Sequence, residues 1–453
     1  MFKEYNKNFI SLVVLLFILS TSSTLFAQKT TTVKHPDWSK NASIYEVNIR
    51  QFTPAGTFKA FQKHLPEIKK LGIDILWLMP INPIGKLNRK GSLGSYYSIS
   101  DYNAVNPEFG TLQDLKNLVN EAHKMGMKVI IDWVANHTSW DNVWTKTHPE
   151  YYLKDKNGNF KVPEKDWTDV IGLNYNNPKL WIAMENAMEY WVKECDIDGF
   201  RCDVAAKVQI AFWDFARMEL EKIKPVFMLA EAEGPKYHKN AFDMTYTWEF
   251  YDIMKKIYAG KMTVNNIDKY YQKEDSLYNP DAYRMMFTSN HDENSWDGSV
   301  FERYDKAAKT FAVLCGVVKG MPLVYSGQEA GMHKRLRFFD KDTIDWKKSD
   351  FRELYTKLIH LKLKNKALWN GIAGGEMNRL NTNDDTNIFA IERGKDGNKI
   401  VAVFNLSTNE REVKLNSDKL VGEFTNLFDG TKVKLQKENS FKLKPWGYLV
   451  YYR

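Results

Sequence analysis

The chain has 453 residues, of which 43% are hydrophobic and 26% charged, and its formal net charge is +8. The lysines are scattered without a long basic run, so this charge is typical of a solvated surface and does not indicate a nucleic-acid partner. The cysteines are Cys195, Cys202 and Cys315, an odd number in apolar contexts, which excludes a disulfide framework.

The first 27 residues have the pattern of a secretory signal peptide. Lys3 and Lys7 precede the apolar run Phe9 to Leu19, and small polar residues then lead to Leu25-Phe26-Ala27. The run is short for a membrane span and no stop-transfer sequence follows it, so we expect removal of residues 1–27 and a secreted or periplasmic protein. A retained signal anchor is the alternative. No other segment resembles a membrane span.

Predicted strands and helices alternate from about residue 40 to about residue 350. Continuous apolar, β-branched runs are typical of parallel strands that are covered on both faces. Such runs lie at residues 43–52, 73–79, 129–137, 198–203, 226–231, 283–287 and 321–325. Helical patterns between them include Phe58 to Ile68, a helix capped by Thr111 and ended by Gly126, and one opened by Asn177-Pro178. This alternation predicts the α/β class and a (β/α)8 TIM barrel.

Polar side chains gather where these apolar runs end, which is the edge of such a barrel where active sites lie. Arg201 and Asp203 share one face of their strand because side chains alternate along it. A guanidinium beside a carboxylate favours the ionised form, so Asp203 is the candidate nucleophile and a structural ion pair is the alternative. Glu231 ends the next apolar run. Glu233 shares its face, but we favour Glu231 because it stands where the apolar residues stop.

The residues at these ends resemble the short conserved regions of the α-amylase family of retaining glycoside hydrolases. The matching segments are Asp132-Trp133-Val134-Ala135-Asn136-His137, Gly199-Phe200-Arg201-Cys202-Asp203, Ala230-Glu231 and Asn290-His291-Asp292, in the family's order. The resemblance implies Asp203 as nucleophile, Glu231 as general acid/base and Asp292 as transition-state stabiliser. It also implies a sugar subsite lined by Tyr97, His137, Arg201 and His291, with Tyr96 as the alternative to Tyr97.

Residues 138–172 lack regular periodicity and form a predicted short insertion after the third barrel strand. Many members of the family place an aspartate here that binds calcium together with the asparagine matching Asn136, whereas this chain has Gly172. Calcium needs six to eight oxygen ligands, so we expect weak calcium binding or none and no required cofactor.

Alternating strands follow a helical segment that runs from Phe351 to about Leu368. They include residues 387–391 and 400–404, and Asp429-Gly430 is typical of a hairpin turn. We therefore expect a catalytic barrel at residues 28–370 and a C-terminal β-sandwich at residues 371–453.

The resemblance implies a hydrolase of α-1,4-glucosidic bonds in starch, glycogen or maltooligosaccharides. We expect cleavage of internal bonds, because a short insertion favours an open groove over a sealed pocket, and we expect a monomer. An exo-acting α-glucosidase, a cyclomaltodextrinase and a glucanotransferase share the same motifs and remain alternatives. A non-catalytic glucan-binding protein is the alternative of another class, although such proteins typically lack one of the acids.

Overall fold

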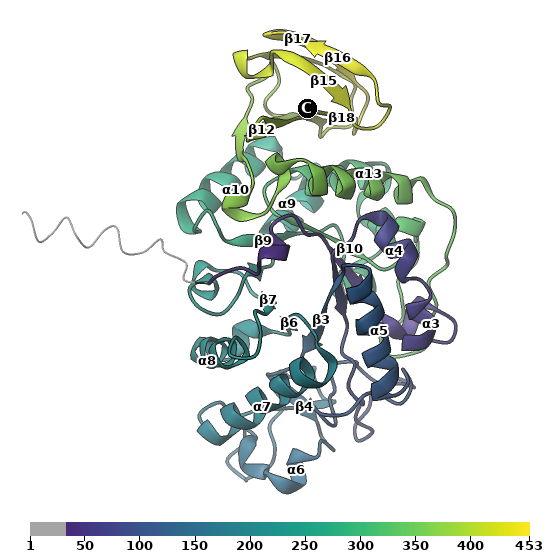
Figure 1. Cartoon of the computed structure of the whole chain (residues 1–453), viewed down its shortest axis with the longest axis vertical. Coiled ribbons are helices and arrows are strands. Elements are labelled where there is room, and N and C mark those ends of the chain that lie inside the picture. Colours follow the sequence, from purple (N-terminus) through teal and green to yellow (C-terminus); the bar gives the residue numbers. More distant parts are fainter. Residues whose placement is uncertain (1–32) are drawn as a thin grey trace, which may run out of the picture.

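The protein was analysed as a computed structural model that describes residues 33–453, so the predicted signal peptide lies outside the described residues. A closed barrel of parallel strands forms the larger part, in the order β1-β10-β9-β8-β7-β6-β3-β2 (Figure 1). This confirms the predicted TIM barrel. The barrel strands are β1 (Ile44–Val47), β2 (Ile75–Leu78), β3 (Lys128–Trp133), β6 (Gly199–Cys202), β7 (Phe227–Ala230), β8 (Met244–Thr245), β9 (Tyr283–Met286) and β10 (Met321–Tyr325).

Helices surround the barrel, and local sequence signals fix where two of the longest begin. The Thr111 side chain and Asp114 form a capping box at the start of α5, and Asn177 accepts a hydrogen bond from the Lys179 amide at the start of α7. The helices are α2 (Ile49–Phe52), α3 (Phe58–Gln62), α4 (Leu65–Leu71), α5 (Leu112–Lys124), α7 (Pro178–Cys195), α8 (Ile210–Leu220), α9 (Trp248–Tyr258), α10 (Val264–Leu277), α11 (Val300–Tyr304), α12 (Ala308–Val317) and α13 (Asp350–Lys364).

The first predicted strand is too long, because it continues to residue 52 whereas β1 ends at Val47. Asn48 stops it by accepting a hydrogen bond from the Gln51 amide, which caps the short helix α2. The strand β8 was not predicted, since it has only two residues and no apolar run marks it.

Two layers of apolar side chains hold the barrel together. One layer fills its interior and includes Ile44, Trp77 and Ile130, while the other lies between the strands and the helices. Because side chains alternate along β1, Glu46 faces the same side as Ile44, toward the interior. A carboxylate is thereby placed inside the barrel, near the C-terminal end of β1.

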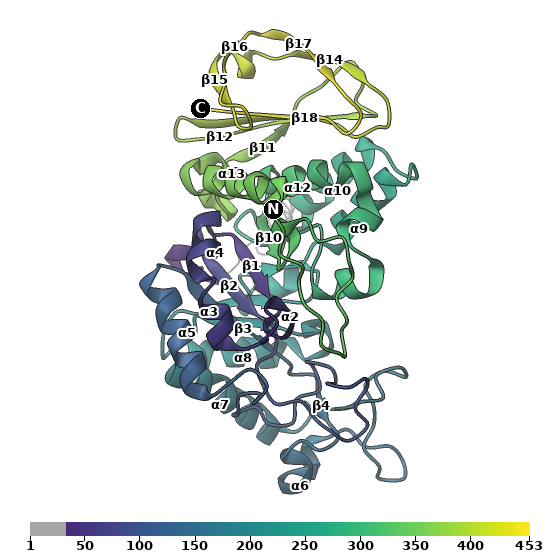
Figure 2. The ribbon, with the colours of Figure 1, turned by 90° about the vertical axis from the view of Figure 1, so that its right-hand side faces the viewer.

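The insertion after β3 is built on a small antiparallel ladder, in which β4 (His137–Ser139) pairs with β5 (Val170–Gly172). It also contains the helix α6 (Trp144–Thr147). Figure 2 shows β4 and α6 at the end of the molecule opposite the C-terminal strands.

The C-terminal strands form a six-stranded sheet (β11-β12-β13-β18-β15-β16) and a two-stranded sheet (β14-β17) around one apolar cluster, as expected for a sandwich. The turn at Asp429-Gly430 lies between β15 and β16. The bounds are β11 (Glu376–Arg379), β12 (Ile388–Lys395), β13 (Asn398–Asn405), β14 (Arg411–Asn416), β15 (Gly422–Asn426), β16 (Lys432–Leu435), β17 (Glu438–Leu443) and β18 (Tyr448–Tyr452).

Helices α12 and α13 lie between the barrel and the C-terminal sheet (Figure 2). Two buried basic side chains donate hydrogen bonds to backbone carbonyls at this junction. Arg393 of β12 donates hydrogen bonds to the carbonyls of Val317 and Val318 at the end of α12. Lys362 of α13 donates to the carbonyl of Gly320 and to Asn370 Oδ1.

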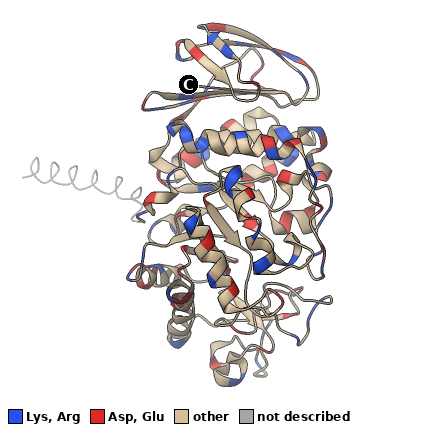
Figure 3. Ribbon diagram, turned by 45° about the vertical axis from the view of Figure 1, so that its right-hand side comes forward, with Lys and Arg blue, Asp and Glu red and all other residues tan. Residues whose placement is uncertain are grey.

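Basic and acidic residues are interspersed along the ribbon in the view of Figure 3, and neither sign gathers in one region of it. Within residues 33–453, no helix has the length and apolar character that crossing a membrane requires.

Candidate active site

A cavity of about 580 Å³ opens at the C-terminal ends of the barrel strands. It is lined by five of the seven residues predicted for the site, namely Tyr97, His137, Asp203, Glu231 and Asp292. Arg201 and His291 are buried beneath them and contact them directly. The barrel therefore brings all seven side chains together from the ends of β3, β6, β7 and β9 and from the loop after β2.

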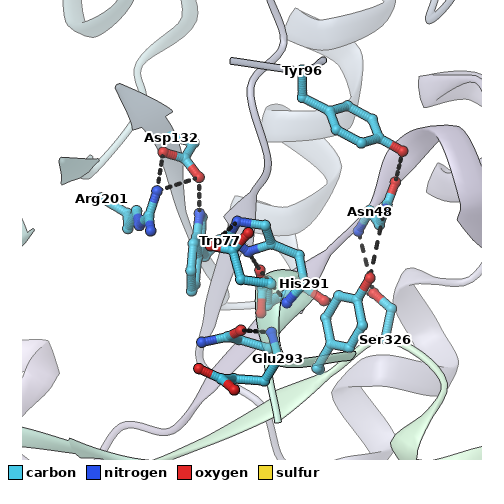
Figure 4. A network of polar contacts seen from close by, with 12 residues as sticks. Asn48, Trp77, Tyr96, Asp132, Arg201, His291, Glu293 and Ser326 are labelled. Atoms are coloured by element: carbon cyan, nitrogen blue, oxygen red, sulfur yellow. Dashed lines mark hydrogen bonds and ion pairs between the residues drawn. The ribbon is translucent and has the colours of Figure 1, made fainter. Parts of the chain in front are cut away.

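Arg201 is the fully buried cation at the floor of this cavity. Its Nη1 donates hydrogen bonds to Asp203 Oδ1 at 3.1 Å and to Asp132 Oδ1 at 2.9 Å, and its Nη2 lies 3.0 Å from Glu231 Oε2. Asp132 also accepts a hydrogen bond from Trp77 Nε1 at 3.2 Å (Figure 4). One guanidinium thus contacts three carboxylates and fixes their relative positions.

Asp203 and Glu231 both have a pKa above the usual range of a carboxyl. Burial and the neighbouring Glu231 carboxylate raise the pKa of Asp203 well above its usual range, against the opposing effect of Arg201. Burial also raises the pKa of Glu231. The expectation that Arg201 keeps Asp203 ionised is therefore too simple, because Asp132 and Glu231 compete for the same cation. Two buried carboxyls that repel each other are expected to hold one proton between them.

Val204 orients Glu231 from the turn that follows β6. Its backbone lies in the left-handed region, with φ at 34°, which is strained for a β-branched residue. In this conformation the Val204 amide donates a hydrogen bond of 2.6 Å to Glu231 Oε2. The strain at Val204 is therefore located where a backbone donor meets the candidate acid.

His291 connects the cavity to a carboxylate inside the barrel. Its Nδ1 lies 2.5 Å from Glu46 Oε1, and its Nε2 lies 2.6 Å from Tyr97 Oη and 3.2 Å from Asp292 Oδ2. Burial alone lowers the pKa of His291, but the carboxylates of Asp292 and Glu46 outweigh it and raise that pKa well above its usual range. Burial raises the pKa of Asp292, but His291 outweighs it and lowers that pKa. The pair is thus an imidazolium beside a carboxylate.

Tyr97 and Tyr96 have different surroundings. The Tyr97 ring lines the cavity, stacks on His291 at 5.3 Å, and its hydroxyl donates to Asp132 Oδ2 at 2.9 Å. Tyr96 instead donates to Asn48 Oδ1 and lies below the Arg50 guanidinium, away from the cavity lining. Of the two tyrosines, Tyr97 is therefore the one whose ring lines the cavity.

His137 lines the cavity as a neutral imidazole. Burial, with a smaller contribution from Lys207, lowers its pKa to about 3. Glu233, the sequence competitor of Glu231, is paired with Arg284 at 3.3 Å and does not line the cavity.

Sequence reasoning missed several residues of the site. Glu46 was detectable, because a carboxylate inside an apolar strand is a signal by itself. The aromatic side chains of Trp296, in the helical turn Glu293–Asp297, and of Phe338, in the loop after β10, also line the cavity, and no periodicity indicated them.

The residues around Asn136 do not fit calcium. The Asn136 amide Nδ2 donates a hydrogen bond of 3.1 Å to His137 Nδ1. Gly172 supplies no carboxylate, and a Cβ there would lie 3.1 Å from Leu153 Cδ1. Across residues 33–453, no group of three or more histidine, cysteine or acidic side chains is arranged to hold a metal ion.

The family model, a curated relative and the solved structures that resemble this chain all point to the same family. Residues 25–170 and 165–357 match the family model described as the α-amylase catalytic domain. The chain is 26% identical to α-amylase 2 of Dictyoglomus thermophilum, over 90% of this chain and 75% of the relative.

Two solved structures share both the fold and 30% of aligned residues. They are an α-amylase from Lactobacillus plantarum, with a TM-score of 0.82, and the maltogenic α-amylase AmyB from Thermotoga neapolitana, with a TM-score of 0.83. Each likeness covers 92% of this chain and 99% of the other.

Proposed function

Because the chain belongs to the α-amylase family, we propose that it is an exported hydrolase that cleaves α-1,4-glucosidic bonds of starch, glycogen or maltooligosaccharides with retention of configuration. The observation that carries this proposal is the convergence of Asp203, Glu231 and Asp292 on one cavity over a single guanidinium. A retaining glycosidase needs two closely spaced carboxyls with different protonation states.

The two carboxyls on Arg201 fit the two steps of a double displacement. Glu231 carries the shared proton and gives it to the glycosidic oxygen, while ionised Asp203 attacks the anomeric carbon. Water then enters, Glu231 removes its proton, and the bond between sugar and Asp203 breaks. The contact of Arg201 Nη1 with Asp203 Oδ1 supports the ionised nucleophile when the proton is on Glu231.

Asp292, His291 and His137 have the chemistry to stabilise the reacting sugar. Asp292 adds negative charge near the oxocarbenium-like centre, while the His291 imidazolium, through its Nε2, favours the ionised form of Asp292. The neutral His137 has one N–H to donate, because Nδ1 already accepts from Asn136.

The maltogenic name of the Thermotoga neapolitana enzyme supports an α-glucan substrate, and the leader at residues 1–27 supports export. The residues around Asn136 give no reason to propose a calcium cofactor.

A chromatographic time course on starch and on maltoheptaose tests the proposal, with the anomeric form of new reducing ends read by NMR. We expect shorter oligosaccharides released as α-anomers, and Asp203→Asn should abolish release while glucan binding persists. β-Anomeric products would contradict the retaining mechanism. An active Asp203→Asn variant would exclude that residue as the nucleophile, and an inactive native protein that binds glucan would favour the non-catalytic alternative.

A further inference from the structure

The loop after β2 is hydrogen-bonded to the insertion at several points, including the Lys86 amide to Asp141 Oδ2 at 2.8 Å and Ser98 Oγ to the Asp169 carbonyl at 3.0 Å. Lys90 adds a charged side-chain contact at the catalytic cavity. Lys90 Nζ donates a hydrogen bond of 2.6 Å to the Asp166 carbonyl and lies 3.1 Å from Asp169 Oδ1. The Asp169 side chain is 7% exposed and that of Lys90 is 32% exposed, so this pair is partly shielded from solvent. We call Lys90, Asp166 and Asp169 the Lys90 bridge, and all three line the catalytic cavity.

The same loop is fixed on its other side to the loop after β10. The Leu93 amide donates to the Phe339 carbonyl at 3.0 Å, and Ser92 donates to Asp340 Oδ1 through its amide at 2.8 Å and its hydroxyl at 2.6 Å. Gly91 adopts φ 62°, and a Cβ there would lie 2.5 Å from Phe339 Cβ. The insertion, the loop after β2 and the loop after β10 therefore form one continuous wall.

The strand order shows on which side of the scissile bond this wall lies. Glu231 follows β7 and protonates the leaving group, so the reducing-end part of a bound glucan lies on that side. The strand β2 is three strands from β7 by the shorter route, through β6 and β3, and is nearly opposite it in the closed barrel. Tyr97 and Lys90 both belong to the loop after β2. The wall therefore lies on the non-reducing side of the sugar at the cleavage point.

We propose that the Lys90 bridge closes the non-reducing end of the substrate site, so that the enzyme acts from chain ends and releases one short product of fixed length. The inference rests on the proposed glucan hydrolysis and assigns Lys90 and Asp169 as specificity-determining residues. It replaces the open groove expected from the short insertion, since the loop after β2 supplies the closure that the insertion alone does not.

Maltoheptaose carrying a fluorescent label at its reducing end tests this at early times. We expect the native enzyme to shorten the labelled chain in steps of one constant length, and Lys90→Ala to give labelled fragments of several lengths from the first time points. Labelled fragments of several lengths from the native enzyme would overturn the inference and leave glucan hydrolysis standing. The same holds if Lys90→Ala gives the same set of labelled fragments as the native enzyme. Absence of any product from the native enzyme would overturn both.

Matched variants separate the bridge from general effects on the fold. Lys128→Ala removes a lysine whose side chain is also 32% exposed and pairs at 3.2 Å with Asp198, but at the other end of the barrel. Lys128→Ala should give the same labelled fragment lengths as the native enzyme, and so should Lys90→Arg. Asp169→Asn should give fewer additional fragment lengths than Lys90→Ala, because Lys90 can still donate its hydrogen bond to the Asp166 carbonyl.

A second substrate tests the native enzyme without any variant. Maltoheptaose blocked by a 4,6-acetal at its non-reducing end cannot enter a closed end in the normal register. We expect a large loss of cleavage rate relative to the unblocked chain, whereas equal rates would overturn the inference.

Discussion

Arg201 contacts three carboxylates, and the effect of its charge on each of them depends on the presence of the other two. The spacing to Asp203 was visible in the sequence because both lie on one short strand. The partners Asp132 and Glu231 come from neighbouring strands, so their competition for the guanidinium depends on the barrel register. Arg201, Asp203 and Glu231 could be named from their places at the ends of apolar runs, and the resemblance to the family implied the other four, but the protonation states of all seven depend on contacts between strands.

Glu46 acts through His291, and its neutral isostere should expose that role. In Glu46→Gln the imidazolium loses a buried carboxylate partner, so the pKa of His291 falls and the alkaline limb of the pH profile of kcat shifts to lower pH. Loss of a hydrogen bond to a charged group should lower kcat by about 10- to 100-fold. An unchanged pH profile with a lowered melting temperature would indicate a purely structural role.

At the scale of elements, local signals predicted the helix starts at Thr111 and Asn177 because a cap involves only neighbouring residues. The end of β1 and the existence of β8 were not predicted. The hydrogen bond that stops β1 comes from a short helix within an apolar stretch, and β8 is held by its neighbours β7 and β9 rather than by its own two residues.

Helix α7 contains a buried acid that makes stability depend on pH. Glu185 is 5% exposed and its Oε1 has no hydrogen-bond partner, and burial raises its pKa to about 7. Because the folded state holds this proton more tightly than the unfolded state, the free energy of unfolding falls as pH rises from about 4.5 through about 7.

Glu185→Gln should therefore raise the free energy of unfolding by about 1 to 2 kcal/mol at pH 8 and leave it nearly unchanged at pH 4. Urea unfolding at the two pH values measures this, with Glu121→Gln on α5 as a partly exposed control. Equal stabilisation at both pH values would show that the ionisation of Glu185 is not the cause.

At the scale of the whole molecule, the barrel and the sandwich were predictable because alternating strands and helices give way to strands alone after about residue 370. How the loops after β2, β3 and β10 meet was not predictable, since these loops have no periodicity. The wall around Lys90 is formed by the contacts among these three loops.

Calcium removal tests the molecule as a whole. Because the residues around Asn136 offer no carboxylate cluster, EDTA should change the melting temperature by less than about 2 °C, well below the change expected when a bound ligand is lost. If EDTA lowers the melting temperature by more than this, and if adding calcium restores it, the protein has a calcium site that these residues do not indicate.

The buried basic side chains at the junction with the C-terminal sheet affect how this protein can be engineered. Arg393 and Lys362 are each 1% exposed, and the carbonyls of Val317, Val318 and Gly320 accept their hydrogen bonds. Truncation after the barrel would remove Arg393 and leave the carbonyls of Val317 and Val318 without their donor. It would also uncover the apolar cluster that the barrel shares with Ile391, Ala402 and Phe404. The barrel is therefore not a self-sufficient catalytic module for fusions or domain exchange, and the C-terminal sheet has to accompany it.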